Sequence, residues 1–359
     1  MKRRIGILTM AGATVLGAVL LAACLGTAGC STAGYYAQSI GGHLALLNAA
    51  RPVGDWLGEA STPEPLRERL ALAQRIRDYA VAELKLPDNA SYRRYADLRR
   101  PAAVWNVVAA PELGLTLKTW CFPVVGCVGY RGYFDRADAE ALAAQLRAEG
   151  WEAAVYPVPA YSTLGRLNWL GGDPLLSTFI RYPEGELARL VFHELAHQVA
   201  YASDDTTFNE SFATAVERLG GARWLAQAGD AARSDYERYD ARRQQFRALT
   251  QRARTVLDAV YRSDAADDAK RQRKAGILAA LRAEHAALKA GPWAGFAGYD
   301  AWLERANNAS LGVVAAYNEL VPQFERLFER EGRDFARFYA EVRRIAALPK
   351  AERRATLPP

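Results

Sequence analysis

The chain has 359 residues, of which 50% are hydrophobic and 24% are charged, a composition typical of folded globular proteins. A chain of this length can bury a large core without disulfide bonds, so collagen-like, disordered and disulfide-scaffold classes are excluded. The formal net charge is +6, but Lys2, Arg3 and Arg4 lie in a leader without acidic residues. Without them, 43 basic side chains face 40 acidic ones. The remaining charge of +3 is too small to indicate a nucleic-acid partner.

The first thirty residues have the layout of a secretory signal, with a basic start, an apolar run and small residues before a cysteine. The apolar run is nearly long enough to be a transmembrane anchor instead. Two short segments favour a lipoprotein signal, because Leu21-Ala22-Ala23-Cys24 resembles a bacterial lipobox and Thr27-Ala28-Gly29-Cys30 is a looser second match. We expect a signal peptide over residues 1–29 and a lipid on Cys30, or on Cys24. The mature protein is then anchored to a membrane of the bacterial cell envelope, facing the periplasm or the exterior.

The next part of the chain changes from helical to strand-like patterns. Leucines at helical spacing predict that residues 35–100 are helical, with interruptions at prolines. Residues 104–133 are rich in β-branched and aromatic residues and predict two or three antiparallel strands. An amphipathic helix is expected over residues 136–149 and a further strand over residues 152–158. A segment rich in turn-forming residues follows over 161–174.

Two cysteines, Cys121 and Cys127, lie close together within this strand-rich part. In an oxidising envelope compartment they could form a disulfide that closes a small loop. They could equally be two buried thiols in neighbouring strands. The chain has no Cys-x-x-Cys pattern, so a cysteine-based zinc or redox site is not expected.

From Glu184 onward the pattern is almost entirely helical. We expect helices over about residues 185–201 and 208–225, and long charged helices over 230–290. A last pair of helices is expected over residues 297–345, with a turn near Gly332.

The strongest motif is the run His193-Glu194-Leu195-Ala196-His197. Histidines four positions apart on a helix lie on the same face, so both imidazoles can bind one cation. Glu194 is placed beside them, where its carboxylate can take a proton from a water activated at a zinc ion. The apolar residues around this run predict a helix buried nearly all round, and buried ionisable side chains need partners. A chance occurrence of the motif on a surface helix is therefore disfavoured.

A third ligand is available a short distance downstream. After the small and polar residues 203–207, the chain can reverse and return a second helix that presents Glu210 to the metal. Glu217 lies two turns further along the same helical face, where it can hydrogen-bond a ligating imidazole and fix its tautomer. Asn209 could cap this helix, or its side chain could hydrogen-bond the backbone beside the site.

These motifs support a resemblance to known enzymes. The run His193-Glu194-Leu195-Ala196-His197-Gln198, followed by Asn209-Glu210-Ser211-Phe212-Ala213 through Glu217, resembles the zinc site of the gluzincin metallopeptidases. It is especially similar to that of aminopeptidase N-like enzymes, which carry His-Glu-Leu-Ala-His-Gln and then Asn-Glu-Gly-Phe-Ala…Glu. The resemblance implies one Zn²⁺ per chain, with His193, His197 and Glu210 as ligands and Glu194 as the general base.

The whole chain is also similar to a family of bacterial lipoproteins described as zinc aminopeptidases. This similarity includes the leader and the segments Gly34-Tyr35-Tyr36-Ala37-Gln38 and Tyr161-Ser162-Thr163-Leu164-Gly165. It implies a peptide substrate and attachment to a membrane through the N-terminal lipid.

Two departures from the aminopeptidase N-like pattern limit the resemblance. The spacer between His197 and Glu210 is twelve residues long, which is shorter than the corresponding spacer of aminopeptidase N-like enzymes. The Gly-x-Met-Glu-Asn segment that binds a substrate's free amine is missing, since Met1 and Met10 are the two methionines of the chain. The acidic residues that could replace it are Glu152, Asp173, Glu184 and Glu186, although each could equally be an ordinary surface carboxylate. The candidates for stabilising a developing oxyanion are Tyr317, Tyr161 and His285.

These observations predict an α+β fold that is mostly helical and gluzincin-like, with a small antiparallel sheet beside the metal-site helix. An exposed strand edge within residues 104–160 is expected to bind the substrate backbone. The expected divisions are an N-terminal helical segment (30–100), a catalytic core of sheet and zinc-site helices (101–228) and a C-terminal helical region (229–359). The expected function is a zinc-dependent aminopeptidase. An endopeptidase of envelope quality control and a non-catalytic lipoprotein with a structural metal site are the alternatives.

Overall fold

The computed structural model describes residues 34–358, apart from 123–125 and 166–167. The predicted signal peptide, with Cys24 and Cys30, lies outside the described residues. The chain divides into two compact units, residues 1–46 and residues 47–359, and residues 34–49 are helical. Within the described part of the chain, no helix combines the length and the apolar character needed to cross a membrane. The predicted divisions after residues 100 and 228 stay predictions.

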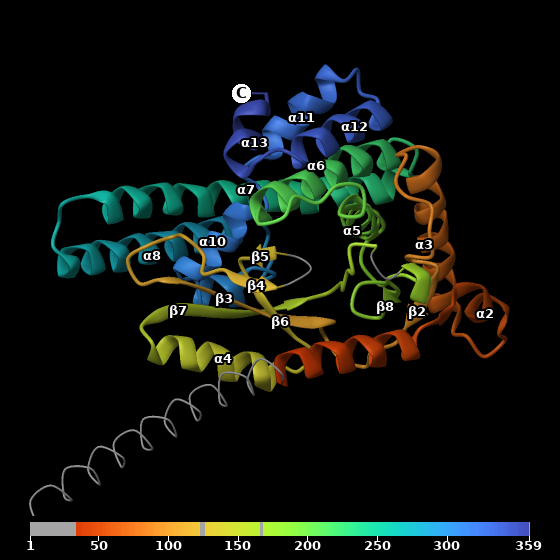
Figure 1. The fold of residues 1–359 in the computed structure, drawn as a ribbon, viewed down its shortest axis with the longest axis horizontal. Helices are drawn as coiled ribbons and strands as arrows, with labels where there is room; N and C mark the ends of the chain where they lie inside the picture. The colour runs from red at the N-terminus through yellow and green to blue at the C-terminus, as the bar shows by residue number, and fades with distance from the viewer. Residues whose placement is uncertain (1–33, 123–125, 166–167, 359) are drawn as a thin grey trace, which may run out of the picture. The chain divides into compact units, whose positions relative to one another are not determined.

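A small antiparallel sheet lies at the centre of the larger unit (Figure 1). Its middle strand, β3 (Val104–Pro111), pairs with β6 (Arg131–Tyr133) on one side and β7 (Trp151–Val158) on the other. The strand is apolar and buried along most of its length, because helices cover both of its faces. Helix α4 (Arg136–Ala148) lies on one face and α10 (Asn308–Ala316) on the other (Figure 1). The expectation of a mostly helical α+β protein with a small antiparallel sheet agrees with this architecture.

Two further sheets are very small. Strands β1 (Arg51–Pro52), β2 (Arg94–Ala96) and β8 (Leu175–Leu176) form one of them, with β2 and β8 parallel. Strands β4 (Trp120–Phe122) and β5 (Gly126–Val128) form a hairpin in which Cys121 lies opposite Cys127. These two cysteines are joined by a disulfide bond.

The prediction of helices throughout residues 35–100 is wrong after residue 82. Helices α2 (Val53–Gly58) and α3 (Glu64–Ala82) are present, but the following residues form turns and strand β2. Pro87 interrupts any helix there, because proline lacks the N–H that the helical ladder requires. Strand β2 forms because it pairs with segments about 45 and 80 residues away, β1 and β8, which local periodicity does not reveal.

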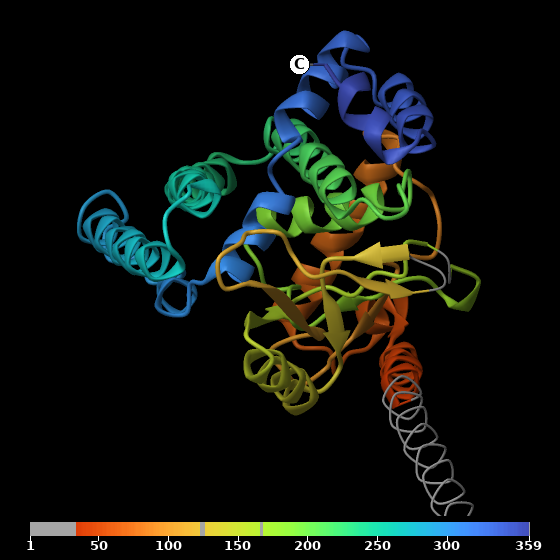
Figure 2. The same cartoon turned by 60° about the vertical axis from the view of Figure 1, so that its left-hand side comes forward.

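The remaining helices complete the unit around the sheet. Helices α5 (Glu184–Ala196) and α6 (Thr206–Leu225) pack against each other, and α3 packs on α5 while α11 (Val321–Arg330) packs on α6. Helices α7 (Asp230–Arg262) and α8 (Asp267–Ala290) form an antiparallel hairpin (Figure 2). Its apolar interior centres on Phe246, Leu257, Leu281 and Trp293.

The expected last pair of helices is instead a series of short ones. In addition to α10 and α11 they are α9 (Asp300–Glu304), α12 (Phe335–Ala346) and α13 (Lys350–Thr356). Asn307 and Ser310 form a capping box that starts α10, and Pro322 lies in the first turn of α11, so each begins as a separate helix. The predicted turn at Gly332 is confirmed, with φ of 72° between α11 and α12.

Candidate metal centre

The end of α5 carries the His-Glu-x-x-His motif. His193 and Glu194 are in its last turn, and His197 is the residue that caps it, with its N–H donating to the His193 carbonyl at 3.3 Å. The predicted extension of this helix to residue 201 is wrong. The Asn209 side chain accepts from the Ala202 N–H at 2.7 Å and donates to the Ala202 carbonyl at 2.8 Å. These bonds satisfy the peptide groups of Ala202 outside a helix, so the chain can turn toward α6.

Helix α6 then returns with Glu210 facing the two histidines. Asp205 caps its N-terminus, because the Asp205 carboxylate accepts from the Phe208 N–H at 3.2 Å. Asn209 instead binds the preceding turn at Ala202. The predicted second helix therefore starts two residues earlier than expected, at Thr206.

Three potential ligand atoms converge between α5 and α6. The Nε2 atoms of His193 and His197 are 3.2 Å apart, and Glu210 Oε2 is 3.4 Å from the first and 3.6 Å from the second. All three residues are buried. Tetrahedral zinc with bonds of about 2.0–2.1 Å separates its ligands by roughly 3.3–3.4 Å, so the group fits such an ion.

The chemistry of this group also fits a cation better than an apolar core. Glu210 Oε2 is buried and has no hydrogen-bond partner among the described residues, and two imidazole nitrogens face it. Burial would raise the pKa of Glu210, but the two histidines lower it to about 2. Because a buried carboxylate is costly without compensation, a bound metal would satisfy all three side chains.

Glu217 holds one of the two imidazoles. Its Oε2 lies 3.0 Å from His193 Nδ1, while Oε1 is bonded by the guanidinium of Arg189. The ionised carboxylate can only accept, so His193 Nδ1 donates and Nε2 presents its lone pair to the site. Burial opposes a charge on His193, but the neighbouring carboxylates of Glu210 and Glu217 raise its pKa well above the ordinary 6.5. A proton therefore competes with a metal for His193.

A cavity of about 260 Å³ opens beside His193 and Glu194. Helix α5 forms one wall, and the end of β7 with the residues after it, Val158 to Ala160, forms another. Glu194 is partly exposed and lines this space. A carboxylate that lines a cavity beside a metal site can act on a water or a substrate placed there.

Of the three candidates for oxyanion stabilisation, Tyr317 is the one that contacts the site. Its ring stacks on that of His193 with centroids 6.1 Å apart, and it lines the cavity. Burial and the charge of Glu210 raise the pKa of Tyr317 well above 10.0, so its hydroxyl stays protonated and can donate. The other two candidates contact other rings. The ring centroids of Tyr161 and Phe134 are 5.2 Å apart, and those of His285 on α8 and Trp293 are 5.5 Å apart.

The four acidic candidates for binding a substrate amine are all engaged by other groups. Glu152 accepts from Lys274 and from the Asn308 N–H, and Glu184 accepts from Trp224 Nε1 at 3.0 Å. Glu186 lines the cavity and forms two bonds of 2.8 Å with Arg243.

The fourth candidate, Asp173, is buried within electrostatic reach of Glu194. It accepts hydrogen bonds from the Thr163 N–H at 3.0 Å and hydroxyl at 2.8 Å. Burial raises the pKa of Asp173 to about 6; the bonds from Thr163 act against this rise and the charge of Glu194 adds to it. Asp173 therefore organises the segment after β7 and is less available as an anion than an exposed aspartate.

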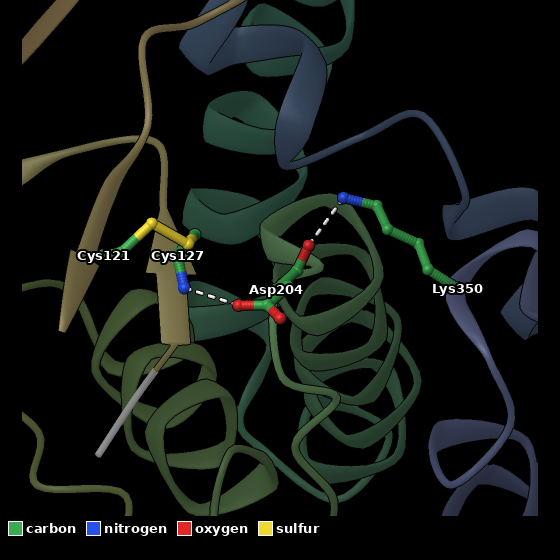
Figure 3. The surroundings of a disulfide bond; sticks show 4 residues. All are labelled: Cys121, Cys127, Asp204 and Lys350. Atoms are coloured by element: carbon green, nitrogen blue, oxygen red, sulfur yellow. Dashed lines mark hydrogen bonds between the residues drawn. A yellow bond between two sulfur atoms is a disulfide. The ribbon is translucent and has the colours of Figure 1, made fainter. Parts of the chain in front are cut away.

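The turn between the ligands is held from outside by the disulfide hairpin (Figure 3). The Cys127 N–H donates to Asp204 Oδ1 at 2.6 Å, and Lys350 Nζ donates to the Asp204 carbonyl at 2.6 Å. A side chain at Gly126 would place its Cβ 2.4 Å from Asp204 Oδ1, so this contact needs glycine. The hairpin and the C-terminal helix α13 thus meet at the segment that joins His197 to Glu210.

Several residues of the site were not identified from the sequence. Arg189 is buried one turn before His193, and Ser211 bonds the Ala316 carbonyl and the Leu320 N–H, which fixes the segment that carries Tyr317. Tyr130 and Tyr156 both have their pKa raised, first by burial and then partly by the charge of Glu210. With 17 tyrosines in the chain, no sequence signal distinguished these two; an arginine four positions before a ligand is a signal that could have been noted.

The fold and the site together define a mostly helical α+β protein with a buried His-His-Glu group beside a cavity. A model of the family described as "Putative aminopeptidase" matches residues 34–357. The chain belongs to this aminopeptidase family, and thus to a family of peptidases that act on peptides. No curated protein and no solved structure matches the chain.

Proposed function

We propose that this protein is a zinc-dependent aminopeptidase with a gluzincin-type site. The observation that carries the proposal is the spacing of the buried nitrogen and oxygen atoms of His193, His197 and Glu210, which suits tetrahedral zinc. A zinc ion held there would act as a Lewis acid that polarises a carbonyl group and makes a water acidic near neutral pH.

The residues around this group have complementary roles in peptide hydrolysis. Glu194, lining the cavity beside His193, accepts the proton of the attacking water and passes it to the departing amine. The protonated hydroxyl of Tyr317 donates to the carbonyl oxygen as negative charge develops on it. Glu217 keeps His193 oriented throughout.

The substrate is proposed to lie along the outer side of β7. This strand is at the edge of its sheet, and the residues at its end line the cavity. An extended peptide can add to such an edge. Pro157 has no N–H, so at this position the edge offers a carbonyl acceptor alone.

We also propose that the protein is a lipoprotein of the bacterial cell envelope, with its lipid on Cys30 or Cys24. The support is the pattern of small residues before each cysteine. Metabolic labelling with a fatty acid should be lost in either the Cys30→Ala or the Cys24→Ala variant. Equal labelling of the parent and the double variant would contradict the anchor.

The metal content of the full-length protein tests the catalytic proposal. Mass spectrometry should find about one zinc per chain in the parent and a clear loss in Glu210→Ala. Peptides with a free N-terminus should be cleaved and their acetylated counterparts should not. Equal cleavage of both would indicate an endopeptidase, and a folded parent without zinc would contradict the proposal.

A further inference from the structure

Arg189 is an arginine almost fully enclosed beside the metal site, with 2% of its surface exposed. It lies on α5, four residues before His193, so the two side chains are on the same face of the helix. One end of its guanidinium bonds Glu217 Oε1. The other lies 3.2 Å from Asp240 Oδ1 and 3.3 Å from the Tyr236 hydroxyl.

Glycines on α5 and α6 leave room for Arg189 and for Tyr236, whose hydroxyl it contacts. A Cβ at Gly221 on α6 would lie 2.9 Å from Arg189 Cγ. A Cβ at Gly185 on α5 would lie 2.8 Å from the Tyr236 ring. Glycine within a helix costs about 0.5–1 kcal/mol relative to alanine, and the close approach of these side chains explains why both positions are glycine.

Glu217 connects the arginine to the metal site. Its Oε1 binds Arg189 and its Oε2 lies 3.0 Å from His193 Nδ1. Each carboxylate oxygen of Glu217 thus has its own partner, on α5, and the direction of the carboxylate is fixed from both sides.

The same chain of contacts extends to α7. Asp240, which holds Arg189, also lies 3.3 Å from Arg243 Nε, and Arg243 in turn holds Glu186 on the cavity wall. Arg189 is buried and the other three side chains are partly buried, and charged groups that are mutually paired in such a position resist displacement more than a single pair does. The orientation of His193 is thus connected to residues on a helix outside the predicted catalytic core.

We propose that Arg189 is a positioning residue of the metal site: it fixes Glu217, which orients His193, and it anchors this arrangement to α7 through Asp240. Arg189 does not touch the reacting atoms and acts through Glu217. The inference rests on the proposed zinc site, and its failure can be told apart from failure of that proposal.

The test measures zinc affinity of the full-length protein by competition with a chelator. Outer partners of ligating histidines typically contribute 10- to 100-fold to metal affinity. Arg189→Met should weaken zinc binding by about 10-fold or more, and Arg189→Lys should recover part of this loss. The visible spectrum of the cobalt-substituted protein should change in Arg189→Met, because the orientation of a ligating imidazole changes.

Two further variants distinguish a specific role from general destabilisation. Lys274→Met is a matched control, because Lys274 is also a buried cation paired with a carboxylate, Glu152; its zinc affinity should equal that of the parent. If Arg189 acts through Glu217, the double variant Arg189→Met/Glu217→Gln should bind zinc no more weakly than Glu217→Gln alone.

A zinc affinity and a cobalt spectrum unchanged in Arg189→Met would overturn the inference, as would additive losses in the double variant. Arg189→Met leaves Glu217 with one partner fewer and could fail to fold. In that case two variants decide the question. Arg189→Lys keeps a cation beside Glu217, and the double variant has no carboxylate charge at position 217 that would lack its partner. A parent that binds no zinc would overturn the proposed function and this inference together, whereas a zinc-binding parent with unaffected variants would overturn the inference alone.

Discussion

At the scale of single residues, a change at Glu194 tests the proposed catalytic role separately from the proposed metal binding. It lines the cavity beside His193 but is not one of the three converging ligands. Glu194→Gln keeps the size of the side chain and removes its ability to accept a proton. We expect zinc content to be unchanged and kcat to fall by about 10²- to 10⁴-fold, measured with a cleavable peptide and by metal analysis.

The matched comparisons are His193→Ala and Glu184→Gln. His193→Ala removes a ligand and should lose both zinc and activity. Glu184→Gln, on the same helix, should keep both, because the contact of Glu184 is with Trp224. Full activity in Glu194→Gln would exclude the proposed proton acceptor.

Asp173 makes stability depend on pH in a predictable direction. Its pKa is about 6 in the folded protein, against 3.8 as its ordinary value, so the folded state binds this proton more tightly than the unfolded state. As pH rises from about 4 to 6, the unfolded state loses this proton while the folded state keeps it, so the free energy of unfolding falls by roughly 3 kcal/mol in total across this window and is level above it.

Denaturant unfolding of the parent and of Asp173→Asn between pH 4 and 7 checks this expectation. The free energy of unfolding of the parent should fall relative to that of the variant as pH rises. A difference that is constant over this range would mean that Asp173 ionises normally in the folded protein.

The local part of the site could be predicted from the sequence, and the distant part could not. The positions of His193, His197 and Glu210 follow from helical spacing and a short turn, and the structure brings the three together. Tyr317 is more than one hundred residues from the ligands, and its stacking on His193 depends on how α10 meets α6. It could be named as a candidate among many tyrosines, but the sequence offered no reason to prefer it.

At the scale of elements, the disulfide hairpin β4–β5 is expected to support the turn between the ligands. It contacts Asp204, which lies between His197 and Glu210. Replacing both cysteines in Cys121→Ser/Cys127→Ser should lower the free energy of unfolding by about 2 kcal/mol for so short a loop. It should also weaken zinc binding, since the turn is held less firmly.

Unfolding by denaturant and chelator competition measure the two effects. The control is a reducing agent, which should weaken zinc binding in the parent and have no effect in the double variant. A variant that loses stability but keeps the zinc affinity of the parent would show that the hairpin stabilises the fold without supporting the site.

Errors in the predicted elements share a physical cause. Helix α5 stops at Ala196 because Asn209, thirteen residues later, binds the peptide groups of Ala202. Strand β2 exists because β1 and β8 pair with it. Both depend on contacts between separate segments, whereas α4 was predicted closely because its amphipathic pattern and its cap, Asp135, are local.

At the scale of the whole unit of residues 47–359, the site draws on elements far apart in the sequence. The cavity is lined by the end of β7, by α5 and α6, by Arg243 of α7 and by Tyr317 after α10. The proposed ligands lie on two helices and their partners lie on others, so metal binding would be a property of the assembled unit. The stability of that unit should therefore depend on the metal.

Removing the metal tests this dependence. A ligand that binds the folded state alone, at about 1,000 times its dissociation constant, adds roughly 4 kcal/mol to the free energy of unfolding. For a chain of this size we expect a chelator to lower Tm by about 5–10 °C, and added zinc to restore it. Glu210→Ala should have a Tm that the chelator does not change, because the site lacks its carboxylate. A Tm that is the same with and without zinc in the parent would mean that the three side chains hold their positions unaided, through Glu217, Arg189 and Asn209, and that the metal contributes to chemistry without contributing to the fold.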